Sequence, residues 1–126
     1  MVCVTVWRAT IWRSRAIADA YVRNYGARIM QGPFAGMEYV TSATEGALTP
    51  RLIGTYDSEL HPYLATFAAK PLDCVIDVGC AEGYYAVGLA RLMPGVTVHA
   101  FDIQEKARLA CAELAAKNDV QDRVMI

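Results

Sequence analysis

The sequence lacks the features on which several common kinds of protein depend. Its four cysteines include no C-x-x-C pair, and its two histidines, His61 and His99, complete no metal-ligand spacing. No run approaches the roughly 18 apolar residues that a membrane span needs, and the N-terminus lacks the layout of a signal peptide. We therefore predict neither a metal site nor a membrane span.

Net charge is also almost absent. It is −1 over 126 residues, so no overall field draws the protein to nucleic acid or to acidic membranes. Residues 1–30 nevertheless carry five arginines against one aspartate. Such a basic stretch can touch RNA or a membrane surface, but it is more often the solvated face of a helix that packs on its own domain. We favour the second interpretation and expect no nucleic-acid or membrane partner.

What the sequence does contain is a large apolar fraction. Hydrophobic residues make up 55% of the chain, which exceeds the content of disordered segments and permits one small domain with a core. Cys74 lies in a strand-like run and Cys111 on the apolar face of a predicted helix, so we expect both to be core thiols. Unpaired core thiols are typical of a reducing environment, and we predict that the protein is cytoplasmic.

Residues 1–70 are predicted to form a helical N-terminal region. Apolar residues recur at helical spacing from Trp7 to Arg28, and Gly32-Pro33 breaks that pattern. Shorter elements follow this helix. We expect a short strand or hairpin at 34–40, a short helical piece with Pro50 in its first turn, and a helix at 59–69 capped by Asp57 or Ser58.

Residues 71–126 show a different, alternating pattern. The run LDCVIDVG at 72–79 is apolar on both faces, as parallel strands covered by helices are. Helices at 83–93 and 104–117 alternate with further strands at 96–102 and 122–126. This β-α-β-α-β order is the first half of a Rossmann-like, doubly wound α/β domain. Right-handed crossovers place its parallel strands in the order 3-2-1.

The first strand would form an open edge of this sheet. An apolar strand with unpaired ladder groups invites aggregation, so we expect its natural neighbours to exist elsewhere. The chain is therefore expected to be the N-terminal part of a longer protein with a missing C-terminal half. The alternative is that a partner chain completes the sheet, for example a second copy in a homo-oligomer.

The stretch VIDVGCAEGYYAVGLA at 75–90 contains the candidate ligand-binding turn. In a doubly wound sheet, ligands bind beyond the carboxyl ends of the strands, where residues 79–83 fall. Gly79 permits a turn with no β-carbon in the way, and Gly83 lets the next helix start close to strand and ligand. The backbone N–H groups of residues 81–84 are expected to be unpaired and to face the site.

A second acidic position specifies the ligand further. Asp102 lies 19 residues after the turn and ends the second predicted strand. A carboxylate there can accept hydrogen bonds from both hydroxyls of an adenosine ribose. The dinucleotide pattern G-x-G-x-x-G fits poorly, because Ala81 and Tyr84 stand at its second and third glycines. Asp77 and Glu82 would also repel a diphosphate, whereas they suit a cationic ligand.

These residues resemble the class I S-adenosylmethionine-dependent methyltransferases. The similarity is close over 74–103, which holds an acidic residue, Gly-x-x-x-Gly and an acidic end to the second strand, and it is loose over 32–126. GPFAGMEYV at 32–40 and TPRLIGTYDSELHPYL at 49–64 also resemble the N-terminal region of bacterial methyltransferase-like proteins, some of FkbM type. The resemblance implies an incomplete seven-stranded methyltransferase fold, with S-adenosyl-L-methionine as its small-molecule cofactor.

The resemblance also implies roles for individual residues. Asp77 would hold the methionine amino group, Asp102 would bind the ribose hydroxyls, and Ile103 would lie against the adenine. The residue that reads the adenine amino group would follow the third strand, beyond Ile126. The predicted cofactor-binding residues are therefore Asp77, Gly79, Cys80, Ala81, Glu82, Gly83, Tyr84, Asp102 and Ile103.

Simpler roles remain open for several of these residues. Cys80 suits a small loop filler better than a nucleophile, because no base stands near it in sequence. Glu82 is equally well explained as an acid stabilised by the helix dipole, and one of Tyr84 and Tyr85 as a packing residue. No residue is assigned as a catalytic base, and the N, O or C atom that would accept the methyl group is not identified. The alternative functions are an NAD(P)-dependent oxidoreductase half and a non-catalytic binding or assembly module.

Overall fold

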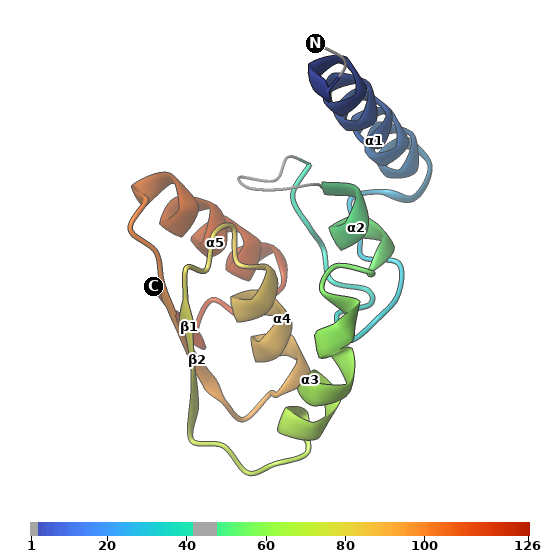
Figure 1. Ribbon diagram of the computed structural model, residues 1–126. Coiled ribbons are helices and arrows are strands. Elements are labelled where there is room, and N and C mark those ends of the chain that lie inside the picture. The colour runs from blue at the N-terminus through green and yellow to red at the C-terminus, as the bar shows by residue number, and fades with distance from the viewer. Residues whose placement is uncertain (1–2, 42–47) are drawn as a thin grey trace.

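The computed structural model describes the backbone of residues 3–41 and 48–126, with side chains from residue 13 onward in these ranges (Figure 1). A helical N-terminal region precedes the β-α-β-α-β region, and this predicted order is confirmed. The elements are α1 (Cys3–Tyr25), α2 (Leu48–Ile53), the 3₁₀ turn η1 (Ser58–Leu60), α3 (His61–Ala68), β1 (Cys74–Val78), α4 (Tyr84–Leu92), β2 (Thr97–Phe101), α5 (Glu105–Lys117) and β3 (Val124–Met125).

The described strands form one parallel sheet with β2 in the middle, which confirms the predicted strand order. β1 pairs with β2 along its whole length and brings Val78 beside Phe101, and β2 pairs in turn with β3. The chain moves across the sheet in one direction, from β1 to β2 to β3, so two right-handed crossovers place α4 and α5 on the same face of the sheet. Val98 and Ala100 of β2 point to that face and are fully buried, and α4 and α5 lie on one side of the strands (Figure 1).

The opposite face of the sheet is open in the part of the chain that the structure describes. Ile76 and Val78 of β1 are 65% and 81% exposed, and Phe101 of β2 is 54% exposed. Cys74 lies on the same face of β1 as Ile76 and Val78 and is also exposed, so its predicted core placement is wrong, whereas Cys111 on α5 is buried as predicted. The apolar pattern of β1 thus marks two faces, of which the described helices cover one.

The long helix α1 extends away from the sheet and packs on α2 near its middle (Figure 1). The Thr49 hydroxyl donates a hydrogen bond of 2.6 Å to the Ser14 carbonyl, and Ala18 is buried at 1% exposure. Arg13, Arg15 and Arg23 are exposed, so these basic residues of α1 face solvent. None of the described helices is long and apolar enough to cross a membrane.

Residues 34–40 form no regular strand. Residues 33–36 make a turn, after which the N–H of Ile29 donates to the Met37 carbonyl at 2.9 Å and the N–H of Tyr39 to the Ala27 carbonyl at 2.7 Å, around one antiparallel bridge between Arg28 and Glu38. Gly36 explains the difference, because its N–H donates a hydrogen bond of 2.9 Å back to the carbonyl of Ile29 and closes a tight loop. Gly36 has a φ of +78°, which a strand does not tolerate.

An aromatic cluster joins the N-terminal region to α4. Tyr84, at the start of α4, makes edge-to-face contacts with Phe34, Tyr39 and Tyr56 at ring-centroid distances of 5.2, 5.8 and 5.2 Å. Aromatic pairs of this geometry are each worth about 0.5–1.5 kcal/mol beyond the burial of their surface. Phe34 also reaches the backbone of α4 at Gly88, where a β-carbon would lie 2.6 Å from its ring. The two regions therefore share one core.

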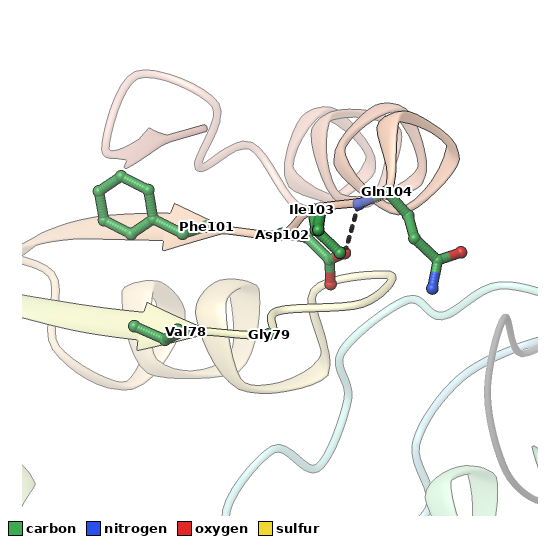
Figure 2. Close-up of a pocket in the computed structure, with 6 residues that line it drawn as sticks. All are labelled: Val78, Gly79, Phe101, Asp102, Ile103 and Gln104. Carbon is green, nitrogen blue, oxygen red and sulfur yellow. Dashed lines mark hydrogen bonds between the residues drawn. The ribbon is translucent and has the colours of Figure 1, made fainter.

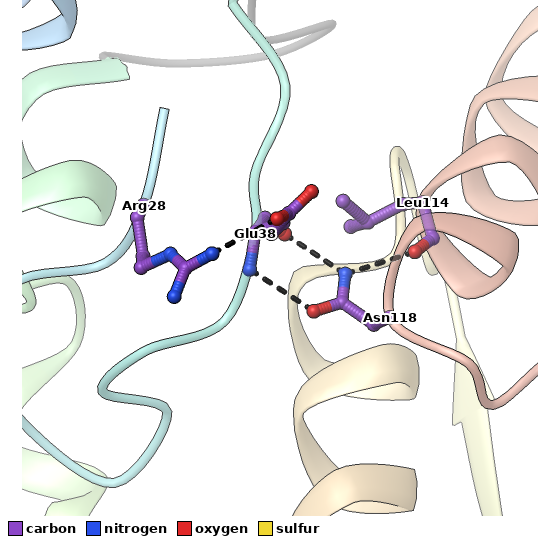
Figure 3. Close-up of polar contacts among 4 residues, drawn as sticks. All are labelled: Arg28, Glu38, Leu114 and Asn118. Atoms are coloured by element: carbon purple, nitrogen blue, oxygen red, sulfur yellow. Dashed lines mark hydrogen bonds and ion pairs between the residues drawn. The ribbon is translucent and has the colours of Figure 1, made fainter. Parts of the chain in front are cut away.

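Asn118, the residue that caps the C-terminus of α5, attaches the N-terminal region at a second point (Figure 3). Its Oδ1 accepts the Glu38 N–H at 3.0 Å, and its Nδ2 donates to the carbonyls of Glu38 and Leu114, both at 2.9 Å. The side-chain amide thus pairs with residue 38 as a neighbouring strand would. The Arg28–Glu38 ion pair beside it, 2.9 Å long, is exposed and contributes little.

We expect Gly88→Ala to lower the free energy of unfolding by about 1–3 kcal/mol, the usual range for overpacking a core. The new β-carbon would lie 2.6 Å from the ring of Phe34, which is 3% exposed, so the core around it would have to shift. Gly95→Ala is the control, since nothing lies within 4 Å of its β-carbon position. Urea denaturation measures both variants, and equal stability of the two would contradict this packing.

Candidate functional site

The turn between β1 and α4 folds back onto the end of β2. The N–H groups of Gly79 and Cys80 both donate to the carbonyl of Phe101, at 2.8 and 3.0 Å. Positive φ angles at Gly79 (83°), Ala81 (47°) and Gly83 (95°) produce the tight bend. Glycine adopts such angles freely, but the left-handed conformation of Ala81 is unfavourable by about 1–2 kcal/mol. The bend thus brings bare backbone to the edge of the sheet and holds one strained residue there.

The Asp102 carboxylate lies beside this bend and is bound by two backbone amides. Its Oδ1 accepts the N–H of Gln104 at 2.8 Å, which is the contact drawn in Figure 2. Its Oδ2 accepts the N–H of Ala81 at 3.0 Å. The hydrogen bonds from Gln104 and Ala81 hold the pKa of Asp102 below its usual value, so the group is ionised at neutral pH. An ionised carboxylate has about four acceptor positions, so Asp102 keeps capacity for further donors.

The prediction that the N–H groups of residues 81–84 are unpaired is wrong at two positions. The Ala81 N–H binds Asp102, and the Gly83 N–H donates to the carbonyl of Cys80 at 2.8 Å. The physical reason is that the bend closes on itself and on the residue after β2, which satisfies these amides inside the protein. A ligand at this site would therefore contact carboxylates and backbone surface more than free amides.

A pocket of about 400 Å³ lies at the carboxyl ends of β1 and β2 (Figure 2). Its volume falls within the range of small-molecule sites. A β-carbon on Gly79 would meet nothing within 4 Å, so a ligand can approach the backbone there. Ile103 is 95% exposed and Val78 81% exposed, which leaves apolar surface for a ligand to cover. The residues that line the pocket are Val78, Gly79, Phe101, Asp102, Ile103 and Gln104.

Asp77, the penultimate residue of β1, carries a buried oxygen without a hydrogen-bond partner among the described residues. Burial raises the pKa of its carboxyl, the Ala86 backbone amide opposes that rise, and the negative charge of Asp102 adds to it. A buried polar atom that lacks a partner calls for a ligand or water. An ammonium group would donate a hydrogen bond to this atom, and the positive charge of an ammonium or a sulfonium would offset the repulsion between the two carboxylates.

Glu82 belongs to a buried network rather than to the pocket lining. Its side chain is 1% exposed, and its Oε1 accepts a hydrogen bond of 2.5 Å from the Tyr39 hydroxyl. The Arg51 guanidinium lies 3.4 Å from the same oxygen and 4.3 Å from the ring centroid of Tyr56. Sequence reasoning offered a ligand contact or a helix-dipole role for Glu82, and it missed Tyr39 and Arg51. Their clustering with acidic Glu82 could not be read from any local spacing.

Cys80 and Tyr84 also lie outside the pocket lining. Cys80 is 4% exposed, and burial raises the pKa of its thiol, which disfavours the reactive thiolate. Cys111 lies close to it, and burial raises the pKa of that thiol to about 12. Tyr84 is 5% exposed within the aromatic cluster, and burial raises its pKa to about 12. These placements fit packing roles. Of the predicted cofactor-binding residues, Gly79, Asp102 and Ile103 line the pocket, whereas Asp77, Ala81 and Gly83 do not.

Neither a metal cluster nor a catalytic base is found at the pocket among the described residues. No three His, Cys, Asp or Glu side chains in 3–41 and 48–126 are grouped to hold a metal ion. Of the six lining residues, Asp102 is the one with an ionisable side chain. His61 lies instead within the N-terminal region, at the start of α3, where its Nε2 is 3.2 Å from the carbonyl of Tyr56.

Comparison with known proteins finds one informative relative. The release factor glutamine methyltransferase of Synechocystis sp. (strain ATCC 27184 / PCC 6803 / Kazusa) is 29% identical over 117 residues, which are 90% of this chain and 37% of that protein. The chain thus spans little more than a third of that relative. No family model matches the chain, and no solved structure matches it significantly. The match supports a distant relationship to methyltransferases, and the FkbM-type resemblance stays a prediction.

We expect Asp77→Asn to raise the free energy of unfolding at neutral pH. Burial raises the pKa of Asp77 above its value in the unfolded chain, so its ionised form is disfavoured in the folded protein. The gain in the free energy of unfolding is therefore complete at pH values above the pKa of Asp77 in the folded protein. It decreases as the pH falls from that pKa toward the lower pKa of Asp77 in the unfolded chain. Denaturation at about pH 7 and about pH 4 measures this difference.

The control for this prediction is Asp73→Asn, because Asp73 is exposed and precedes β1 at the far end of the strand. Surface substitutions of this kind change stability by about 0.5 kcal/mol or less. An Asp77→Asn protein that is less stable than the wild type at neutral pH would contradict the burial argument.

Proposed function

We propose that this chain is the cofactor-binding part of an S-adenosylmethionine-dependent methyltransferase. The observation that carries the proposal is the pair of acidic groups on either side of the bend. Asp77 has a buried oxygen with no described partner, and Asp102 is ionised beside an open pocket of about 400 Å³. Two carboxylates next to bare backbone suit a ligand that combines a ribose with positive charge. The distant methyltransferase relative supports the same reading.

The residues present fit such a cofactor group by group. Asp77 would bind the cationic amino end, and Asp102 would accept hydrogen bonds from the ribose hydroxyls with its remaining lone pairs. Ile103 and Val78 would cover the adenine, since both are exposed apolar side chains at the pocket. Gly79 would let the ligand approach the backbone. When bound, the cofactor supplies an activated methyl group, so the protein's task is binding and orientation.

The methyl acceptor is not part of this proposal. The Synechocystis relative is named for glutamine in a release factor, and that substrate belongs to a protein of which this chain spans 37%. None of the six pocket residues offers a base besides the ionised Asp102, which is already committed to Ala81 and Gln104. We therefore propose the reaction class, methyl transfer to an N, O or C nucleophile, and assign no catalytic residue.

A nicotinamide dinucleotide fits the same pocket less well. Its diphosphate would lie near two carboxylates, Asp77 and Asp102, and repulsion would weaken binding. Ala81 stands where a dinucleotide site needs glycine for close approach, and its N–H is already bound to Asp102. The non-catalytic alternative, a binding or assembly module, predicts no affinity for any nucleoside.

Calorimetry of the full chain with S-adenosylhomocysteine and with NADH tests the proposal. We expect S-adenosylhomocysteine to bind and Asp102→Ala to weaken it about 100-fold, because two charge-assisted hydrogen bonds of roughly 1.5 kcal/mol each would be lost. Asp73→Ala, at the opposite end of the strand, is the matched control and should bind as the wild type does. Binding of NADH alone would favour the oxidoreductase, and binding of neither compound would favour the assembly module.

A further inference from the structure

Glu82 is the charged residue of the Gly79–Gly83 bend, yet its side chain faces the N-terminal region instead of the pocket. Its carboxylate accepts a hydrogen bond of 2.5 Å from the Tyr39 hydroxyl and lies 3.4 Å from the Arg51 guanidinium. The Arg51 side chain is 6% exposed and lies over the ring of Tyr56. A carboxylate buried to this extent must be compensated, which makes the contacts strong and directional. The bend is therefore anchored to residues 39–56.

The residue before Glu82 is the strained one. Ala81 has a φ of +47°, which is a left-handed backbone conformation. Residues other than glycine, asparagine and aspartate rarely adopt it. Such a conformation persists when the surrounding structure holds it on more than one side. The Ala81 N–H is held by Asp102 at 3.0 Å, and the adjoining residue is held by Tyr39 and Arg51. The strain thus lies between two anchors.

We propose that Glu82 is a positioning residue for the cofactor site. Through Tyr39 and Arg51 it fixes Ala81 in its left-handed conformation, and the Ala81 N–H then fixes the orientation of the Asp102 carboxylate. The inference rests on the proposed function for the identity of the ligand that Asp102 receives. Its new content is that residues of the N-terminal region set cofactor affinity without touching the cofactor.

This arrangement has a consequence for Asp102. A carboxylate that must accept two ribose hydroxyls needs a fixed orientation, because each misdirected hydrogen bond loses most of its strength. Gln104 fixes one oxygen and Ala81 the other. If the bend relaxes, the hydrogen bond from Ala81 is lost while the one from Gln104 remains. Asp102 then stays ionised, but its carboxylate no longer has a fixed orientation.

The main test compares two Tyr→Phe variants of the full chain. Tyr39→Phe removes the hydroxyl that binds Glu82, and Tyr85→Phe removes a hydroxyl in the same aromatic cluster that donates to Asp57 at 2.8 Å. Both delete one phenol–carboxylate hydrogen bond, but the Tyr85 bond does not involve the bend. We expect Tyr39→Phe to weaken S-adenosylhomocysteine about tenfold and Tyr85→Phe to change it less than about twofold. Glu82→Gln is less suitable, because it removes a charge beside a buried guanidinium and endangers folding.

A readout without ligand separates positioning from general stability. Hydrogen exchange of the Ala81 amide should be about tenfold faster in Tyr39→Phe than in the wild type, and unchanged in Tyr85→Phe. Equal Ala81 exchange in Tyr39→Phe and wild type, or equal affinity losses in the two variants, would overturn the inference. If the wild type binds no S-adenosylhomocysteine, the proposed function fails, and Ala81 exchange alone still decides whether Glu82 holds the bend.

Discussion

The structure depends on the compensation of one buried carboxylate. Glu82 is 1% exposed, and the groups that compensate it, the Tyr39 hydroxyl and the Arg51 guanidinium, come from the N-terminal region. An uncompensated charge in this position would be strongly unfavourable, so the N-terminal region must dock where these groups reach the bend. The edge-to-face contacts of Tyr84 with Phe34 and Tyr56 then close around the same point. The contacts of Glu82 with Tyr39 and Arg51 thus fix where the N-terminal region docks, and the aromatic contacts supply most of the buried apolar surface at that point.

The carboxylate before the bend, Asp77, and the carboxylate bound to the bend, Asp102, have opposite environments. Burial raises the pKa of Asp77, whereas hydrogen bonds from Gln104 and Ala81 lower the pKa of Asp102. Asp102 is therefore an ionised acceptor with fixed direction, and Asp77 is a group whose ionised form needs a positive partner. One ligand that brings hydroxyls and a cation satisfies both at once. A diphosphate would satisfy neither, which is why charge separates the candidate ligands better than shape does.

The sequence predicted what depends on local pattern. Glycine and proline breaks and apolar periodicity in 71–126 gave each helix and strand of the β-α-β-α-β order, since these signals act within a few residues. At 34–40 a turn that includes Gly36 limits the antiparallel pairing with 27–29 to a single bridge, so no regular strand forms there. The partnership of Glu82 with Tyr39 joins residues 43 apart, and no spacing rule encodes it. Asp102 was located correctly beside the bend, although its bond to Ala81 was missed.

Two energetically unfavourable features, the left-handed conformation of Ala81 and the Asp77 oxygen without a described partner, lie in or next to the Gly79–Gly83 bend. Three described residues other than glycine have positive φ, namely Asp57, Ala81 and Asp119. Aspartate tolerates the left-handed conformation because its side chain can bond locally, but alanine has no such compensation. Ala81 lies in the same bend that Asp77 precedes, and Asp77 carries a buried oxygen without a described partner. Strained backbone and buried polar atoms without partners concentrate at binding sites, so the occurrence of both in and just before this bend agrees with the proposed site.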